Sequence, residues 1–298
     1  PILVDKYLGG KEVEVDAICD GEQVLIPGVM EHIERAGVHS GDSTAIYPAI
    51  NLSSFEVDTI VDYTTRIGLA LGVRGLMNAQ YVIFEGGVYV IEVNPRASRT
   101  VPFLSKVTKV PMVRLATLIM TGKTLAQQGY SGGLWPRQRL VGVKAPVFSM
   151  AKLVGVDTYL GPEMKSTGEV MGIDFSYEPA LEKALIAAGM ALKPEGALLL
   201  SVADSDKLAA VEVARELGEL GFTLLATRGT AAVLTAHGIS VTGVNKVAEG
   251  RPHIVDMMKN AEVSLIINTG EDKRNAVTDS RAIRTNALAQ RITYYTTM

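Results

Sequence analysis

The feature that most constrains the fold is a regular alternation of strand and helix patterns after Gly196. Residues 197–203 read ALLLSVA, and the amphipathic run DKLAAVEVARELGELG separates them from a second apolar run, FTLLAT. The order continues through TAAVLTAHG, ISVTGV, HIVDMMKN and VSLIINT. Short apolar strands that alternate with helices of about ten residues are typical of parallel βαβ units. This part of the chain therefore predicts a small doubly wound parallel α/β domain.

The first half has the pattern of antiparallel hairpins instead. KEVEVDAIC and EQVLIP alternate around an Asp20-Gly21 turn, and the apolar runs GLMNAQYVIF and VYVIEVN flank Glu85-Gly86-Gly87. A polar loop, EHIERAGVHSGDS, follows the first hairpin. We expect an antiparallel sheet with helices here, so the chain as a whole combines an α+β part with an α/β part.

Two helices are expected to cover this sheet. Residues 53–73 keep helical spacing behind a capping box formed by Ser53 and Glu56, and residues 110–121 form a second apolar run. From there to about residue 190 the pattern is mixed and rich in turns, which indicates a connection between domains. The expected division is a first, partial domain at residues 1–122, a connecting region at 123–190 and a second domain at 191–298.

The composition limits the classes of function. Of the 298 residues, 47% are apolar and 20% are charged, and the net charge of -3 provides no broad basic surface for nucleic acid. No apolar run approaches the roughly 18 residues that span a bilayer, and the N-terminus lacks a signal-peptide pattern. The single cysteine, Cys19, fits a reducing compartment. We therefore expect a cytoplasmic protein with no membrane or nucleic-acid partner.

The end of the second hairpin, VIEVNPRASRT, holds the strongest candidate site. If Phe84 faces Val88 across the turn, polar residues of the two strands oppose one another on a single face of the sheet. The resulting pairs are Gln80 with Glu92 and Asn78 with Asn94.

The chemistry of these residues suits a metal and a phosphate. One carboxylate and several amide oxygens fit a hard cation such as Mg²⁺ or Mn²⁺. Arg96 and Arg99 follow the strand, and a guanidinium matches phosphate or carboxylate geometry. Two plainer interpretations stay open at this point: a solvated polar strand end, and arginines that form ion pairs with neighbouring carboxylates.

Five stretches together resemble a known family. EVNPRASRT, RGLMNAQ, MEHIERAGVHSGDS, VNKVAEGRPHI and SRAIR occur in the order found in the second synthetase half of the carbamoyl phosphate synthetase large subunit. The resemblance covers nearly the whole chain. It implies the carboxyl-terminal lobe of an ATP-grasp fold, followed by a methylglyoxal-synthase-like allosteric domain.

The resemblance also implies roles for single residues of the first half. It places Arg96 near the reacting phosphate and Arg99 near the path of carbamate. Without the resemblance, Glu12 would be interpreted as a solvated acid and His39 as an ordinary loop histidine. The implied metal ligands are Gln80, Glu92 and Asn94. The implied ATP contacts are Lys6, Leu8, Glu12, Gly37, Val38, His39, Ser40, Gln80 and Glu92.

The implied reaction is the phosphorylation of carbamate by ATP, which serves arginine and pyrimidine biosynthesis. The family uses Mg²⁺ or Mn²⁺, with K⁺ as a further candidate, and its implied partners are a glutaminase small subunit and further copies of the large subunit. Because the glycine-rich preceding lobe is absent from this sequence, we expect that the chain alone does not turn over ATP.

The second half has its own candidate site. In a doubly wound sheet, ligands gather beyond the carboxyl ends of the strands, although Ser and Thr at such positions also cap helices. The resemblance implies a site for UMP or IMP, with Gly270 as a departure from the expected hydroxyl residue. The implied residues are Ser201, Lys207, Thr227, Thr230, Lys246 and Asn268.

Ornithine is a third implied ligand. The matching residues are Glu34, Asp42 and Thr296, but Ala145 replaces a further acid of that site. We therefore expect weak or absent activation by ornithine. Two alternative functions remain at this stage: another ATP-grasp carboxylate ligase, and a free-standing nucleotide-binding regulatory module.

Overall fold

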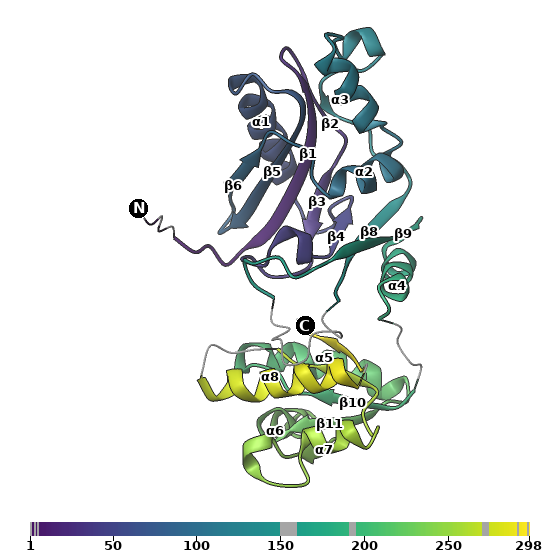
Figure 1. Ribbon diagram of the computed structural model, residues 1–298. Coiled ribbons are helices and arrows are strands. Elements are labelled where there is room, and N and C mark those ends of the chain that lie inside the picture. Colours follow the sequence, from purple (N-terminus) through teal and green to yellow (C-terminus); the bar gives the residue numbers. More distant parts are fainter. Residues whose placement is uncertain are drawn as a thin grey trace. The chain divides into compact units, whose positions relative to one another are not determined.

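The chain forms two compact units in the computed structural model (Figure 1). Unit 1 comprises residues 1–147 and 160–189, and unit 2 comprises residues 148–159 and 190–298. The structure describes residues 2, 4, 6–149, 160–190, 195–269, 274–290, 292–296 and 298, without the side chains of residues 274–279. Within this part of the chain, no helix has the length and apolar character needed to cross a membrane.

Unit 1 is built on a nine-stranded sheet in the described residues, with the order β6-β5-β1-β3-β4-β8-β9; in addition, β2 pairs with β1 and β7 pairs with β2. Its strands are β1 (Lys11–Asp20), β2 (Val24–Ile26), β3 (Val29–His32), β4 (Ala45–Tyr47), β5 (Arg74–Phe84), β6 (Gly87–Asn94), β7 (Gly133–Leu134), β8 (Val141–Val147) and β9 (Gly168–Asp174). Its helices are α1 (Ser54–Ala70), α2 (Thr100–Thr108), α3 (Met112–Met120) and α4 (Tyr177–Ala187), with 3-10 turns η1 (Ser40–Asp42) and η2 (Ala126–Gln128).

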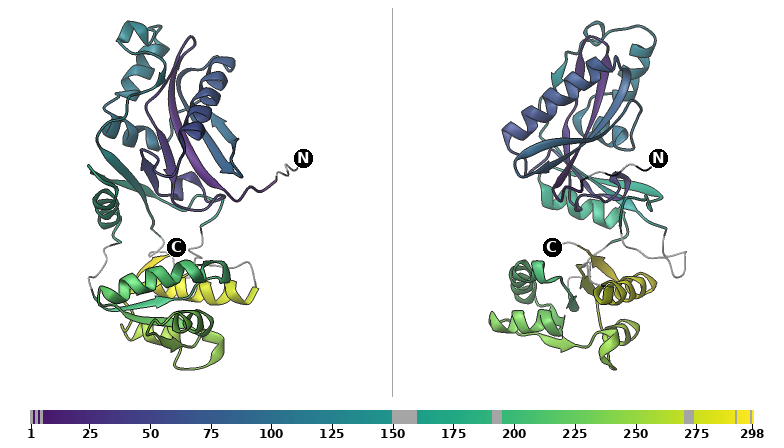
Figure 2. Two further views of the ribbon diagram at one scale, coloured as in Figure 1. Left: turned by 180° about the vertical axis from the view of Figure 1, so that it is seen from behind. Right: turned by 90° about the vertical axis from the view of Figure 1, so that its left-hand side faces the viewer.

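The two faces of β1 have different environments, because α1 packs on one face and α2 and α3 pack on the other (Figure 2). Val13, Val15 and Cys19 point into a core that includes Ile60 of α1. On the opposite face, Ile18 packs in a second core together with residues of α2 and α3. The amino-terminal part of that second face carries acids in place of apolar residues, and this is where the candidate site lies.

The sequence predictions for unit 1 are largely confirmed. The two hairpins form, α1 begins behind the Ser53–Glu56 capping box, and α3 lies within the predicted second helix. The polar loop after the first hairpin was assigned too early, because Glu31 and His32 still belong to β3. Helix α2 was not predicted. Residues 123–190 contain β8, β9 and α4, which pack within unit 1, while the domain division drawn from the sequence stays a prediction.

The second hairpin reaches its predicted pairs by a different route. Phe84 pairs with Gly87 rather than Val88, because Glu85 and Gly86 form a two-residue turn in which both have positive φ, 49° and 77°. A bulge then inserts Ile91 as an extra residue on β6. This shift restores the pairs Gln80 with Glu92 and Asn78 with Asn94, as predicted.

Unit 2 is the predicted doubly wound domain. In the part of unit 2 that the structure describes, five parallel strands have the order β12-β11-β10-β13-β14. They are β10 (Ala197–Leu200), β11 (Thr223–Thr227), β12 (Thr242–Val244), β13 (Leu265–Ile267) and β14 (Thr293–Tyr295). Helices α5 (Lys207–Glu219) and α6 (Arg228–Ala236) cover one face, and α7 (Ile254–Lys259) and α8 (Arg274–Ala289) cover the other, with short turns η4 (Asp204–Asp206) and η5 (Val247–Glu249).

Candidate functional site

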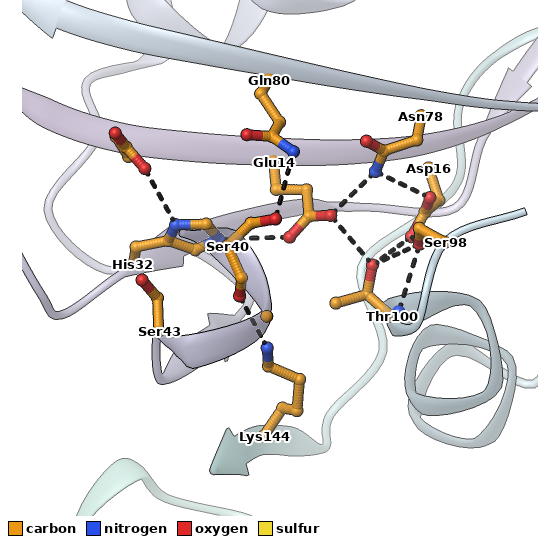
Figure 3. Close-up of polar contacts among 12 residues, drawn as sticks. Glu14, Asp16, His32, Ser40, Ser43, Asn78, Gln80, Ser98, Thr100 and Lys144 are labelled. Atoms are coloured by element: carbon orange, nitrogen blue, oxygen red, sulfur yellow. Dashed lines mark hydrogen bonds and ion pairs between the residues drawn. The ribbon is translucent and has the colours of Figure 1, made fainter. Parts of the chain in front are cut away.

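Three acids occupy alternate positions on one face of β1. Glu12, Glu14 and Asp16 share this face because side chains of a strand alternate between its two sides. On the neighbouring strand β5, Gln80 lies opposite Glu14 and Asn78 lies opposite Asp16. The three acids are almost fully buried, with 7%, 3% and 1% of their surface exposed. A polar row therefore crosses the sheet at a place where desolvation makes each hydrogen bond matter (Figure 3).

The candidate metal ligands converge on one oxygen. Glu92 Oε1 accepts hydrogen bonds from Gln80 Nε2 at 3.1 Å and from Asn94 Nδ2 at 2.9 Å. All three side chains come from facing positions at the end of the β5–β6 hairpin, and Glu92 is exposed. The predicted grouping of Gln80, Glu92 and Asn94 is thus present in space.

The donor set of this group fits a hard cation. Rotating the two amides by half a turn would direct their oxygens to the point that they share with Glu92, because amide oxygen and nitrogen occupy equivalent places. One carboxylate and two amide oxygens suit Mg²⁺ or Mn²⁺, whose remaining ligands are then water or phosphate. Among the described residues, no group of three or more His, Cys, Asp and Glu side chains is arranged to hold a metal ion, and the group around Glu92 has only one such member.

The predicted nucleotide loop lies against the same row. Gln80 Nε2 also donates to Ser40 Oγ at 3.1 Å, which links the loop to the candidate metal ligands. Glu12 accepts from Gly37 N at 2.8 Å, so it is a buried acceptor rather than the solvated acid that its sequence context favours. His39 Nδ1 accepts from Gly41 N at 3.0 Å and caps η1.

The other predicted nucleotide contacts are backbone positions near this loop. Tyr7 Oη donates to Ala36 O at 2.8 Å, which places the segment containing Lys6 and Leu8 beside it. The side chain of Val38 is buried, so only its backbone could contact a ligand.

The two candidate catalytic arginines follow β6 and are both exposed. Arg96 Nη1 donates to Ala97 O at 3.0 Å, and Arg99 Nη1 donates to Ser166 Oγ at 3.1 Å. Both of these bonds go to neutral oxygens rather than to carboxylates. Arg99 also interacts electrostatically with Glu169, whose pKa its charge lowers, although burial raises that pKa overall.

Several buried polar residues of this site were missed by the sequence reasoning. His32, for which no partner was evident, lies between Glu12 and Glu14, with Nδ1 3.5 Å from Glu12 Oε2 and Nε2 3.1 Å from Glu14 Oε2. Lys144 of β8 is 1% exposed and donates to Ser40 O at 3.1 Å. The alternating acids in KEVEVDA could have indicated a polar strand face, but no local signal joins them to residues of β3 and β8.

The charges in this row change one another's pKa. Burial opposes the charged form of His32, but its contacts with Glu12 and Glu14 outweigh burial and raise its pKa to about 9. Burial and the charge of Glu14 raise the pKa of Asp16 to about 6. For Glu14, burial works against ionisation, yet His32 and Lys144 lower its pKa below the ordinary value. A protonated His32 thus stabilises ionised acids inside the sheet.

The predicted site of unit 2 lies at the carboxyl ends of its strands. Ser201 follows β10, Thr227 ends β11 and Asn268 follows β13. Thr227 Oγ1 donates to Ser201 Oγ at 3.4 Å, and Asn268 Nδ2 donates to Ser201 O at 2.9 Å. Thr230 Oγ1 accepts from Val202 N at 3.4 Å. The four predicted residues Ser201, Thr227, Thr230 and Asn268 therefore gather at one edge.

Two features of this edge suit an anionic ligand. Lys207 is the first residue of α5, and its Nζ lies beside the start of α6, where a Cβ added to Gly229 would stand 3.2 Å from it. Lys207 also pairs with Asp204. The Oδ1 atom of Asn268 is buried and has no hydrogen-bond partner among the described residues. Lys246 follows β12 at the same edge, while Gly270 lies outside the described residues.

The predicted ornithine acids are engaged within unit 1. Glu34 accepts from the backbone and hydroxyl of Thr44 at 2.5 and 2.9 Å, and Asp42 accepts from the backbone of Lys165 and Ser166 at 2.8 Å each. The place of the missing acid is an apolar cluster, where Ala145 packs with Ala180 and Ala184 of α4. Thr296 belongs to unit 2 and follows β14.

Comparison with known proteins decides the family. Residues 1–128 match the model described as "Carbamoyl-phosphate synthase L chain, ATP binding domain", and residues 209–296 match the MGS-like domain. Over 299 aligned positions, the chain is 58% identical to the carbamoyl phosphate synthase large chain of Thermomicrobium roseum. The chain belongs to the carbamoyl phosphate synthase large-chain family. The alignment covers 100% of this chain but only 28% of that relative, so it corresponds to one part of a large chain.

Solved structures give a weaker likeness. The "Biotin Carboxylase domain of single-chain bacterial carboxylase" is 17% identical, with a TM-score of 0.48 over 62% of this chain and 47% of that one. A single-chain, multi-domain long-chain acyl-CoA carboxylase is 18% identical, with a TM-score of 0.49 over 61% and 23%. The family of the large-chain segment rests on the sequence matches and not on these two.

The buried histidine of the large-chain segment predicts a pH-dependent stability. Because the pKa of folded His32 lies above its unfolded value near 6.5, the stabilisation is complete below about pH 6.5 and is lost as the pH rises through about 9. The free energy of unfolding of the native chain should exceed that of His32→Gln by on the order of 3 kcal/mol near pH 6, and the difference should shrink toward pH 9. Urea unfolding followed by the fluorescence of Trp135, the single tryptophan, measures this in unit 1. A difference that stays constant between pH 6 and 9 would contradict the prediction.

Proposed function

We propose that this chain carries the metal-binding and nucleotide-binding side of a ligase site that phosphorylates carbamate within a longer large chain. The observation that carries the proposal is the convergence of Gln80 and Asn94 on Glu92, with Ser40 of the nucleotide loop bonded to the same Gln80. This convergence supports a hard-cation site beside a loop that would hold the nucleoside.

The proposed reaction is an in-line phosphoryl transfer. An oxygen of carbamate attacks the γ-phosphorus of ATP, the bond to the β,γ-bridging oxygen breaks, and the electron pair of that bond leaves with ADP. Arg96 neutralises charge on the transferred group, and Arg99 orients the carbamate carboxylate. No residue of the chain needs to act as a nucleophile, since positioning and charge neutralisation carry the rate.

The metal would be held by Gln80, Glu92 and Asn94. A Mg²⁺ or Mn²⁺ ion there would neutralise and orient the ATP phosphates. We propose K⁺ only as an accompanying ion, on the family resemblance. The nucleoside would lie along Lys6, Leu8, Glu12 and residues 37–40.

The wider assignment follows the family. We propose that the complete protein is a glutamine-hydrolysing carbamoyl phosphate synthase that serves arginine and pyrimidine biosynthesis. A glutaminase small subunit would supply ammonia, and the large chain would assemble with further copies of itself. Another carboxylate ligase of the ATP-grasp type would not explain the MGS-like second domain.

Unit 2 is proposed to be the regulatory part. Its strand ends gather hydroxyl groups, a lysine and the unpaired oxygen of Asn268 beside the amino terminus of α6. Free backbone N–H groups and the positive end of a helix favour phosphate. We propose a nucleoside monophosphate, UMP or IMP, as the effector.

Glu92 provides the first test, in the complete large chain that carries these residues. Glu92→Gln removes the carboxylate of the metal group and should lower the rate of ATP formation from ADP and carbamoyl phosphate by at least about tenfold. The concentration of free Mg²⁺ or Mn²⁺ at half-maximal rate should rise. Glu85→Gln, in the turn of the same hairpin, is the matched control and should leave both values unchanged. Equal metal dependence in the Glu92 variant would exclude the proposed ligand role.

The effector site is tested by calorimetric titration with UMP and with IMP. Lys207→Met should weaken nucleotide binding by about tenfold or more, because it removes a charge-assisted hydrogen bond. Lys259→Met is the matched control, since the end of α7 precedes β13 and so lies at the opposite edge of the sheet. A folded chain that binds neither nucleotide would overturn the regulatory assignment.

Ornithine should have little effect on the complete enzyme. Ala145 replaces one proposed carboxylate partner of the ornithine amine, and Asp42 is already occupied by two backbone N–H groups. An amine that loses a buried partner binds more weakly by about 1 to 3 kcal/mol. Titration of the complete enzyme with ornithine measures this, and micromolar affinity would contradict the prediction.

A further inference from the structure

Asp16 is the most deeply buried acid of the polar row, and the proposed function gives it no task. It is 1% exposed in the middle of β1. Its Oδ1 accepts from Asn78 Nδ2 at 3.0 Å, and its Oδ2 accepts from Ser98 Oγ at 2.8 Å and also from Thr100 Oγ1 (Figure 3). These three hydrogen bonds are therefore directed at β5, at Ser98 just before α2 and at Thr100, the first residue of α2.

The two hydroxyl groups that Asp16 holds lie on either side of a candidate catalytic arginine. Ser98 and Thr100 are the chain neighbours of Arg99, and their hydroxyl oxygens lie 2.7 Å apart beside Asp16 Oδ2. The backbone N–H of Thr100 donates to Ser98 Oγ at 3.1 Å, and Thr100 Oγ1 also lies 3.3 Å from Glu14 Oε1. Asp16 is thus the carboxylate that contacts the residues on both sides of Arg99, while Glu14 contacts only Thr100.

The other contacts of Arg99 do not hold its backbone, which is held by the contacts of Ser98 and Thr100 with Asp16. Arg99 occupies the N-cap position of α2 without a capping hydrogen bond from its side chain, so its own side chain does not hold the helix start. Its guanidinium extends to Ser166 Oγ, and Ser166 in turn donates to Gly41 O at 2.8 Å. The arginine therefore lies between a buried anchor at its backbone and a hydrogen bond to Ser166 at its tip, where it also acts on the charge of Glu169.

We propose that Asp16 is a positioning residue for the ligase reaction, which fixes the reach of Arg99 toward carbamate by holding the hydroxyls of Ser98 and Thr100. This inference rests on the proposed function, since it assigns Asp16 a task in that same reaction. Asp16 itself touches no substrate.

A role in the fold alone would not call for a carboxylate here. Burial and the neighbouring Glu14 both disfavour the charged form of Asp16, and the three hydrogen bonds only partly offset them, so its pKa is raised. Buried charges of this kind are commonly replaced by apolar groups without loss of stability. The carboxylate is explained by what it holds, because one oxygen can accept from two hydroxyls while the other accepts from an amide.

The test is a double-mutant cycle in the complete large chain, read as ATP formation from ADP and carbamoyl phosphate. Asp16→Asn keeps the shape of the side chain but replaces one acceptor oxygen by a donor. It should lower kcat/KM for carbamoyl phosphate by about 10- to 100-fold, the scale of a misplaced catalytic group, with less than about a threefold change in KM for ADP. Arg99→Met should cause a similar or larger loss.

Non-additivity is the decisive readout. If Asp16 acts through Arg99, adding Asp16→Asn to Arg99→Met should lower the rate by no more than about twofold. The conservative variant Thr100→Ser should retain the native rate, whereas Thr100→Val should lose it. If Asp16→Asn does not fold, Ser98→Ala takes its place in the double-mutant cycle with Arg99→Met.

Thr64→Val is the matched stability control. It removes a buried hydroxyl bonded to Tyr81 Oη at 2.7 Å, in the core beneath α1. Its thermal midpoint should fall with no change in kcat/KM, which separates loss of stability from loss of positioning.

The outcomes separate the two levels of the assignment. A native large chain that forms no ATP from ADP and carbamoyl phosphate would overturn the proposed function, and the role of Asp16 with it. If the native protein is active, two results would overturn the positioning role alone. One is full activity of Asp16→Asn. The other is a double variant in which the losses from Asp16→Asn and Arg99→Met multiply.

Discussion

The structure of unit 1 depends on the pairing of β1 with β5. Every residue of β1 from Lys11 to Asp20 pairs with this one neighbour, so the register leaves no freedom in the direction of any side chain. Because strand side chains alternate, the pairing sends the odd-numbered apolar residues of β1 under α1 and the even-numbered acids to the other face. A slip of one residue would place the even-numbered carboxylates of β1 in an apolar core, and this penalty fixes the register.

Burial of these acids is made tolerable by the strands that flank them. His32 from β3, Lys144 from β8 and Asn78 from β5 each contribute donors to the row. The result is a hydrogen-bonded polar layer inside the sheet, in which His32 Nδ1 makes no hydrogen bond among the described residues and contacts Glu12 Oε2 only at 3.5 Å. Such a layer is rigid because the loss of a partner leaves a buried polar group unpaired. The exposed groups, Glu92 and the two arginines, are attached to the edge of this layer. Rigid support beneath exposed reactive groups is what a positioning mechanism requires.

In unit 2, the candidate site residues are brought together by the parallel arrangement of the strands and not by strand register. In a parallel sheet all strands end at one edge, so residues far apart in the chain meet there without any long-range pairing of their own. Ser201, Thr227 and Asn268 gather for this reason. The apolar pattern that predicts the strands therefore predicts the site as well, and this is why the sequence reasoning located the edge residues of unit 2.

The sequence by itself determined the classes of both units, the hairpins, the capped helix α1 and the pairs Gln80–Glu92 and Asn78–Asn94, because these depend on local periodicity and turn chemistry. The bulge at Ile91 was decided only by the tertiary structure. The two-residue turn shifts the expected pairing by one position, and the bulge shifts it back, so the predicted pairs form only in the complete hairpin. The partners of His32, the burial of Glu12 and the link from Asp16 to Ser98 and Thr100 also arise only in the fold. These contacts join residues from different strands, and no spacing along the chain encodes which strands become neighbours. Desolvation, which raises the pKa of Asp16, and the carboxylates that raise the pKa of His32 against burial depend on that same neighbourhood.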